Sequence, residues 1–168
     1  MRKTRAALGT ILFFLVAPGV VVGLGPWLLT RWRMADPFPG YAAVRVVGVV
    51  LLVAAVGFLL NAFVRFVVEG VGTPAPTAPT ERLVVGGIYR YVRNPMYLAV
   101  VVAIVAQAML FGRPVLLLYA AAIGLAQAAF VRFHEEPGLR RRYGADYDAY
   151  QAAVPGWRPR LRPWTGRS

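Results

Sequence analysis

The sequence contains no cysteine, a single histidine and only seven acidic residues among its 168 positions. The absence of cysteine excludes disulfide bridges and thiolate chemistry. A lone histidine excludes a metal site built from several imidazoles, so we expect no bound metal. Nineteen lysines and arginines outweigh the acidic residues and give a formal net charge of +12. In a soluble protein, that charge would suggest nucleic acid as a partner.

Charge is also missing from long stretches of the chain. Hydrophobic residues make up 58% of the sequence, above the roughly 45–50% of soluble domains. Arginines flank the apolar stretches, as in chains held at an anionic membrane surface. We therefore expect membrane lipids and not nucleic acid as partners, and an all-α, polytopic membrane protein of one domain.

Four segments without charge predict about four transmembrane helices. They cover residues 6–30, 46–64, 95–111 and 115–131, and about 20 residues are needed to cross a bilayer. The basic start before the first segment leaves a signal peptide as a competing interpretation.

Short polar signals refine this arrangement. Gly112, Arg113 and Pro114 separate the last two segments, which predicts a tight helical hairpin. Asn61, Gln107 and Gln127 interrupt apolar runs, and we expect them to face other helices and not lipid.

The remaining segments read as a loop and a surface helix. Residues 70–95 begin with a run rich in proline and glycine, which predicts an exposed loop. In residues 135–154, apolar side chains recur every three or four positions, which predicts an amphipathic helix on the membrane surface. These side chains are Leu139, Tyr143, Tyr147, Tyr150 and Val154.

The distribution of basic residues predicts the orientation. With four spans, fifteen basic residues lie on the side of the termini and four lie on the other side. The positive-inside rule then places both termini and the 70–95 loop in the cytoplasm, with the chain in the cell inner membrane.

Two polar clusters lie at the predicted cytoplasmic ends of the spans. Asn94-Pro95 has the chemistry of a helix start, and the adjacent Arg93 could pair with a carboxylate. Glu135 and Glu136 follow the last span, where the helix dipole disfavours negative charge. Each cluster alone fits simple interfacial anchoring. Together they suggest a ligand with a carboxylate, a positive centre and a ribose, such as S-adenosylmethionine.

Residues 87–157 resemble the isoprenylcysteine carboxyl methyltransferases and their phospholipid methyltransferase relatives, which are membrane enzymes that use S-adenosylmethionine. The family's Arg-His-Pro-x-Tyr motif is matched here with Asn94 in the place of the histidine. The matching residues are Arg93, Asn94, Pro95 and Tyr97, then Glu135, Glu136, Leu139, Tyr143, Gly144, Tyr147 and Tyr150, and finally Val154, Pro155, Trp157, Pro159 and Arg160.

The resemblance implies roles for individual residues. S-adenosylmethionine would be bound by Tyr89, Arg93, Asn94, Tyr97, His134, Glu135, Glu136 and Tyr147. Arg132 would hold an anionic acceptor, and Glu136 would help an amine acceptor to lose its proton. Asn94 cannot titrate near neutrality as a histidine would, so any role of an imidazole there is in doubt.

The acceptor stays open at this point. The resemblance implies a lipidic or small hydrophobic acceptor, such as a prenylated cysteine carboxylate. A phospholipid amine and a thiol are the alternatives within methyl transfer. From another class, a non-catalytic membrane scaffold fits the same spans, whereas a transporter is disfavoured because no ionisable residue lies at mid-membrane depth. The sequence does not determine the oligomeric state.

Overall fold

The computed structural model describes residues 16–70 and 83–166, and every regular element in these ranges is a helix. The all-α prediction is therefore confirmed. Residues 6–15 of the first predicted span and 71–82 of the predicted loop lie outside the described residues. The elements are η1 (Gly19–Leu24), α2 (Gly25–Thr30), α3 (Ala42–Gly70), η2 (Gly87–Arg90), α4 (Pro95–Phe111), α5 (Val115–Phe130), η3 (Val131–Glu135), α6 (Glu136–Tyr143) and α7 (Ala145–Ala153).

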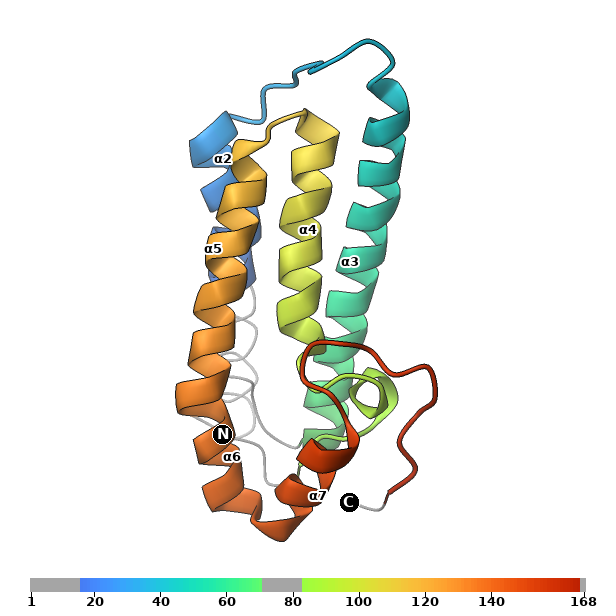
Figure 1. Ribbon diagram of the computed structural model, residues 1–168, viewed down its shortest axis with the longest axis vertical. Coiled ribbons are helices and arrows are strands. Elements are labelled where there is room, and N and C mark those ends of the chain that lie inside the picture. The colour runs from blue at the N-terminus through green and yellow to red at the C-terminus, as the bar shows by residue number, and fades with distance from the viewer. Residues whose placement is uncertain (1–15, 71–82, 167–168) are drawn as a thin grey trace, which may run out of the picture.

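The long helices form a bundle with α4 at its centre. In Figure 1, α4 lies between α3 and α5, and η1 and α2 lie beside α5. Buried side chains of α4 and α5 form the core of the bundle, and they are Val100, Ile104, Ala108, Leu116 and Ala120. At Gly48, α3 approaches α4 so closely that a Cβ would come within 2.9 Å of Ala106 O.

Within residues 16–70 and 83–166, two helices are long and apolar enough to cross a membrane: Ala42–Ala62 and Val115–Tyr143. Val16–Thr30 and Pro95–Phe111 are shorter apolar helices, so the arrangement with four spans stays a prediction. Both long helices turn large apolar side chains outward. Val53 is 69% exposed and Leu118 is 75% exposed, which suits contact with lipid better than contact with water.

Pro26 explains how the first helix is attached to the bundle. Proline has no N–H, so it leaves a carbonyl one turn earlier without its helical partner. Around this point the helix widens into the π-helical turn η1. Gln107 Nε2 donates to Val22 O at 2.8 Å, and Tyr119 OH donates to Val21 O at 3.0 Å. Gln107 thus faces another helix, as predicted.

The hairpin between α4 and α5 turns at Gly112. This residue adopts a left-handed conformation with φ of 64° and ends α4. A Cβ there would overlap Ala35 O in the loop that follows α2. Glycine is therefore required both by its backbone angles and by the close approach of another loop.

The predicted amphipathic helix over 135–154 is broken in the structure. Gly144 has φ of 52° and ψ of −127°, which is neither helical nor comfortable for other residues. Helix α6 therefore ends at Tyr143, and α7 starts in a new direction at Ala145. The apolar pattern survives the break, because Tyr147, Tyr150 and Val154 still form one buried cluster.

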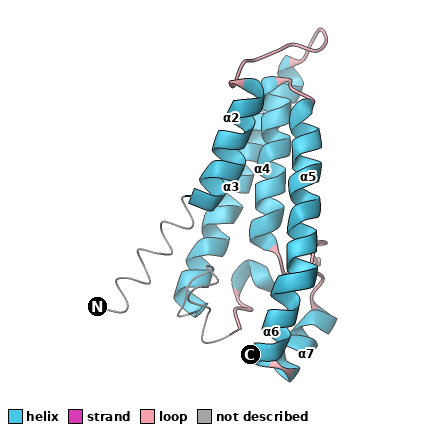
Figure 2. Ribbon diagram, turned by 90° about the vertical axis from the view of Figure 1, so that its left-hand side faces the viewer, coloured by secondary structure: helices cyan, strands magenta, loops and turns pink. Residues whose placement is uncertain are grey.

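Residues 83–94 and 131–166 form a polar unit at one end of the bundle, here called the head. Figure 2 shows α6 continuing the line of α5 beyond the start of α4, with α7 lying next to it. The rest of the head is the short helix η2 and the chain after α7. All the motif residues except Pro95 and Tyr97, which belong to the first turn of α4, therefore lie in the head, at one end of the bundle.

Candidate active site

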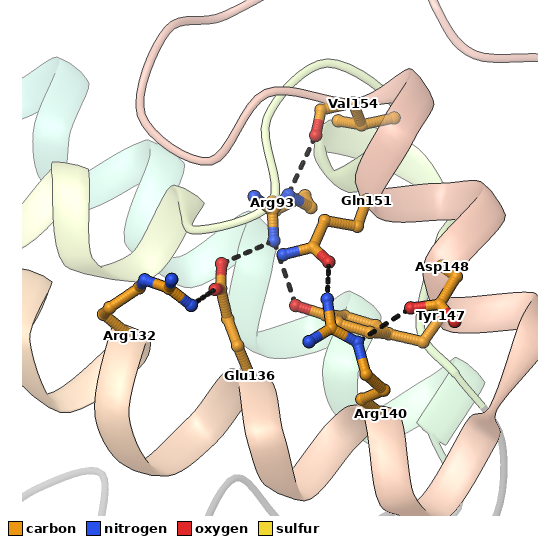
Figure 3. A network of polar contacts seen from close by, with 8 residues as sticks. All are labelled: Arg93, Arg132, Glu136, Arg140, Tyr147, Asp148, Gln151 and Val154. Atoms are coloured by element: carbon orange, nitrogen blue, oxygen red, sulfur yellow. Dashed lines mark hydrogen bonds and ion pairs between the residues drawn. The ribbon is translucent and has the colours of Figure 1, made fainter.

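Arg93 is the centre of the head (Figure 3). It lies just before α4, and its guanidinium reaches the three segments that follow α5. Its Nη1 donates to Glu136 Oε1 and to Tyr147 OH, both at 2.9 Å, and its Nε donates to Val154 O at 2.8 Å. The Arg93 and Glu136 side chains are only 13% and 11% exposed. A buried pair of this kind fixes geometry even where it adds little net stability.

Glu135 has a different environment from its neighbour. Its Oε2 accepts a hydrogen bond from Tyr97 OH at 2.9 Å, and no described cation pairs with it within 4.0 Å. Burial raises the pKa of the Glu135 carboxyl above its ordinary range, and the hydrogen bond from Tyr97 offsets this only in part. Of the two adjacent glutamates, Glu136 is thus paired with a described cation and Glu135 is not.

The π-helical turn η3 sets the direction of these two carboxylates. It covers Val131–Glu135 and comes just before Pro137, whose missing N–H disturbs the regular helical ladder. Such turns are frequent at functional sites because they reorient side chains within a helix. Here Glu135 contacts Tyr97 of α4, whereas Glu136 reaches Arg93 before α4.

The chain after α7 runs back across the start of α4, and residues 154–164 are here called the strap. The main chains are joined by hydrogen bonds from Arg93 N to Pro155 O (3.0 Å), Asn94 N to Gly156 O (3.2 Å), Arg160 N to Tyr91 O (2.9 Å) and Trp164 N to Arg90 O (3.0 Å). Arg90 Nε also donates to Trp164 O at 2.6 Å. The strap therefore holds the first motif from outside.

The close approach of the strap to the first motif requires a small residue at Gly156. A Cβ on Gly156 would lie 3.3 Å from Arg93 Nη2 and from Asn94 Nδ2. A larger residue would press on both side chains of the first motif. The small size of Gly156 thus keeps the strap close to the cavity described next.

A cavity of about 90 Å³ lies inside the head. Its lining combines the motif side chains with apolar neighbours: Leu83, Val84, Tyr89, Arg93, Asn94, Val131, Glu135, Glu136, Leu139, Tyr147 and Tyr150. Asn94 is 8% exposed, and its buried Nδ2 has no hydrogen-bond partner among the described residues. An unsatisfied buried amide is costly, so this donor is available to a ligand.

Two tyrosines close the side of the cavity formed by α7. Burial raises the pKa of the Tyr147 hydroxyl and that of the Tyr150 hydroxyl, so both stay protonated at neutral pH. Tyr150 OH donates to Tyr89 O at 2.7 Å, which joins α7 to η2. The periodic pattern in the sequence identified Tyr150 as part of a buried face, although not as part of the site.

The structure brings together most of the residues predicted as ligands, but not all of them. Tyr89, Asn94 and the two glutamates line the cavity with Arg93 and Tyr147, and Tyr97 joins them through Glu135. His134 is exposed, does not line the cavity and packs its ring against Phe130, with ring centroids 5.1 Å apart. Arg132 is 71% exposed and lies 3.9 Å from Glu136 Oε2.

The sequence did not predict a second and much larger hollow in the molecule. A groove of about 1,050 Å³ runs between α3 and α4 and is almost entirely apolar. It is lined by Leu51, Ala54, Ala55, Gly57, Phe58, Asn61, Ile88, Tyr91, Val92, Pro95, Leu98, Ala99, Val102 and Pro159. Asn61 is therefore exposed to this groove. Residues 88–95 line the cavity on one side and the groove on the other.

Comparison with known proteins supplies the family. No curated protein matches the chain. A family model described as phospholipid methyltransferase matches residues 43–146, which include α3, α4, α5 and both glutamates. The match extends further toward the N-terminus than the motifs do, and it ends before the strap. Since it covers more than half of the chain, the protein belongs to the phospholipid methyltransferase family of membrane methyltransferases.

Proposed function

We propose that the protein transfers a methyl group from S-adenosylmethionine to a lipidic or small hydrophobic acceptor within the cell inner membrane. The observation that carries this proposal is the cavity beside the Arg93–Glu136 pair, where both motifs meet. It presents an unpaired amide donor and a carboxylate without a paired cation. A non-catalytic scaffold would not need such groups to be buried together.

The donor set of the cavity fits S-adenosylmethionine in chemistry. Carboxylates suit ribose hydroxyls and an amino group, and the Asn94 amide suits a carboxylate or a ring nitrogen. The volume of about 90 Å³ matches roughly three waters at about 30 Å³ each. Cofactor binding therefore requires lining side chains or the strap to move outward, as lids do in many enzymes.

The contacts support a change in two of the predicted roles. Arg93 donates from Nε and Nη1 to Val154 O, Glu136 and Tyr147, so we assign it chiefly as a positioning residue. Glu136 is paired with Arg93, which makes it a poor base. Glu135 has a raised pKa and no paired cation, so it is the better candidate to accept a proton from an amine acceptor.

Bound S-adenosylmethionine would supply an activated methyl group on a sulfonium. The residues of the chain would then orient the acceptor and exclude water. The apolar groove between α3 and α4 gives a hydrophobic acceptor a route from the bilayer to residues 88–95. Arg132 is 71% exposed and only 3.9 Å from Glu136 Oε2, so it could turn to an anionic acceptor.

Calorimetry with S-adenosylhomocysteine tests the cofactor. Wild-type protein in detergent is expected to bind, and Glu135→Gln is expected to weaken binding at least tenfold, because a carboxylate ligand is lost. His134→Gln is the matched control, since this neighbouring side chain is exposed and lies outside the cavity. Failure of wild-type protein to bind at millimolar ligand would overturn the proposal.

Labelled S-adenosylmethionine and a total lipid extract would identify the acceptor. Label that is stable to base in a lipid headgroup indicates N-methylation, whereas base-labile label indicates a carboxyl ester. Transfer to an added hydrophobic thiol alone would indicate S-methylation. Cofactor binding without any transfer would support binding but contradict the proposed reaction.

A further inference from the structure

The strap has two faces. On the inner face, Trp157 packs its ring against Tyr97 with centroids 6.4 Å apart, and Arg160 donates from Nη1 to Ala153 O at 2.8 Å. On the outer face, Arg158, Leu161 and Arg162 are all exposed, and Leu161 is 99% exposed. The inner contacts hold the strap to the head, so these outward side chains are held at the surface.

The strap lies at the level where the apolar part of the bundle begins. Pro159 lines the groove together with Leu98 and Val102, which lie within the first turns of α4. In Figure 1 the strap passes beside the lower end of α4 and then extends away from the bundle beyond α3. A bilayer around the apolar helices would therefore have its headgroup region near the strap.

The charges of the outer face are not used within the described part of the chain. No described carboxylate forms an ion pair within 4.0 Å of Arg158 or Arg162, and two acidic side chains of the head are paired with other arginines. Glu136 pairs with Arg93, and Asp148 pairs with Arg140. A single exposed leucine is ordinary on a protein surface. An exposed leucine between two unpaired arginines, at headgroup level, has the composition of an interfacial anchor.

We propose that residues 158–162 bind the anionic lipid surface of the leaflet next to the head. Leu161 inserts below the headgroups, while Arg158 and Arg162 contact their phosphates. The strap holds Arg93 and Asn94 through its other face, so lipid contact on the outside bears on the geometry of the cavity. The inference concerns membrane contact and does not depend on the proposed reaction.

A single nitroxide label tests this contact. Because the chain has no cysteine, Leu161→Cys can be labelled without removing any native residue. The protein is placed in nanodiscs of phosphatidylcholine with or without phosphatidylglycerol, without cofactor or acceptor. Power-saturation EPR then compares collisions of the label with oxygen, which partitions into lipid, and with a water-soluble nickel chelate.

Lipid contact predicts that oxygen dominates at position 161 and that this preference grows with the phosphatidylglycerol fraction. Arg141→Cys is the matched control, because this exposed residue of α6 belongs to the head but not to the strap. Its label is expected to meet the nickel chelate in both lipid mixtures. Equal aqueous collision rates at 161 and 141 in phosphatidylglycerol nanodiscs would overturn the proposal.

A second pair of variants tests the arginines. Arg158→Gln with Arg162→Gln, in the labelled Leu161→Cys protein, is expected to remove the phosphatidylglycerol dependence and reduce the oxygen preference severalfold. Arg141→Gln with Arg142→Gln removes the same charge from α6 and is expected to leave position 161 unchanged. If both pairs reduce the preference equally, net charge and not the strap is responsible, and the proposal fails. Thermal melting of each variant confirms that it is folded.

Discussion

Arginines hold together both ends of the bundle, but they do so in different ways. At the end opposite the head, Arg45 donates to Leu110 O and Ala35 O and pairs with Asp36, which is 71% exposed. In the head, Arg93 pairs with Glu136, which is 11% exposed, beside a cavity. The first arginine joins α3 to the end of α4 and to the loop after α2, in contact with solvent. The second holds a carboxylate away from solvent, and taking an ion pair out of water costs more free energy.

The largest expected effect comes from removing the buried arginine. Arg93→Met removes the nearer cation of buried Glu136 and leaves only the exposed Arg132 at 3.9 Å, and we expect it to destabilise the protein by about 3–5 kcal/mol. Arg45→Met is expected to destabilise the protein much less, because the exposed Asp36 carboxylate stays hydrated when its partner is removed. Thermal melting in one detergent measures both variants. Adding Glu136→Gln to Arg93→Met should recover much of the loss, and equal losses for the two single variants would contradict the comparison.

A smaller effect is expected at the glycines of the two ends. Gly112→Ala forces a left-handed backbone on alanine and brings its Cβ against Ala35 O, which should cost at least about 1–2 kcal/mol. Gly138→Ala in α6 meets no atom within 4 Å, so it should stabilise the head by about 0.5–1 kcal/mol. Melting temperatures shifted in opposite directions would support this reading, and a tolerated Gly112→Ala would refute it.

Removing either of two tyrosine hydroxyls distinguishes an effect on stability from an effect on ligand binding. Tyr147→Phe removes an acceptor from Arg93, and Tyr119→Phe removes the donor to Val21 O. Each is expected to cost about 1 kcal/mol in unfolding free energy. Only Tyr147→Phe should also weaken binding of S-adenosylhomocysteine in calorimetry, because Tyr119 lies in the bundle. Weakened binding in both variants would show that binding merely follows stability.

The smallest expected change in stability belongs to Glu135 and depends on pH. Its folded pKa is raised by burial, so its stabilising contribution is present at low pH and fades as pH rises through that pKa. Glu135→Gln should therefore melt at or above the wild-type temperature at neutral pH, with the difference shrinking on acidification. Acidification should also weaken the binding of S-adenosylhomocysteine to wild-type protein, because the Glu135 carboxyl becomes protonated. A variant less stable than wild type at neutral pH would contradict this assignment.

Local chemistry was enough to predict the bounds of α4, whereas the break between α6 and α7 and the site required the fold. Asn94, Pro95 and Gly112 are start and stop signals, and α4 does run from Pro95 to Phe111. The Asn94 side chain nevertheless makes no capping bond and is buried in the cavity. Hydrophobic periodicity also ran across Gly144, whose backbone conformation breaks the predicted helix.

The partners of Arg93 could not be predicted from spacing. They lie 43, 54 and 61 positions further along the chain, on two helices and the strap. The sequence showed which residue types were unusual, such as adjacent glutamates at a helix end. It did not show that one of them would be paired with arginine and the other bonded only to a tyrosine.

The two carbonyls before Pro26 that accept from other helices have a consequence for how the molecule is assembled. Val21 O and Val22 O are satisfied by Tyr119 of α5 and Gln107 of α4. These two donors are synthesised more than 80 residues after their acceptors, so the two hydrogen bonds that join the first helix to the bundle form only once α4 and α5 have been made. Residues 16–30 are thus made before α4 and α5, yet their register against the bundle is set only when the central hairpin lies beside them.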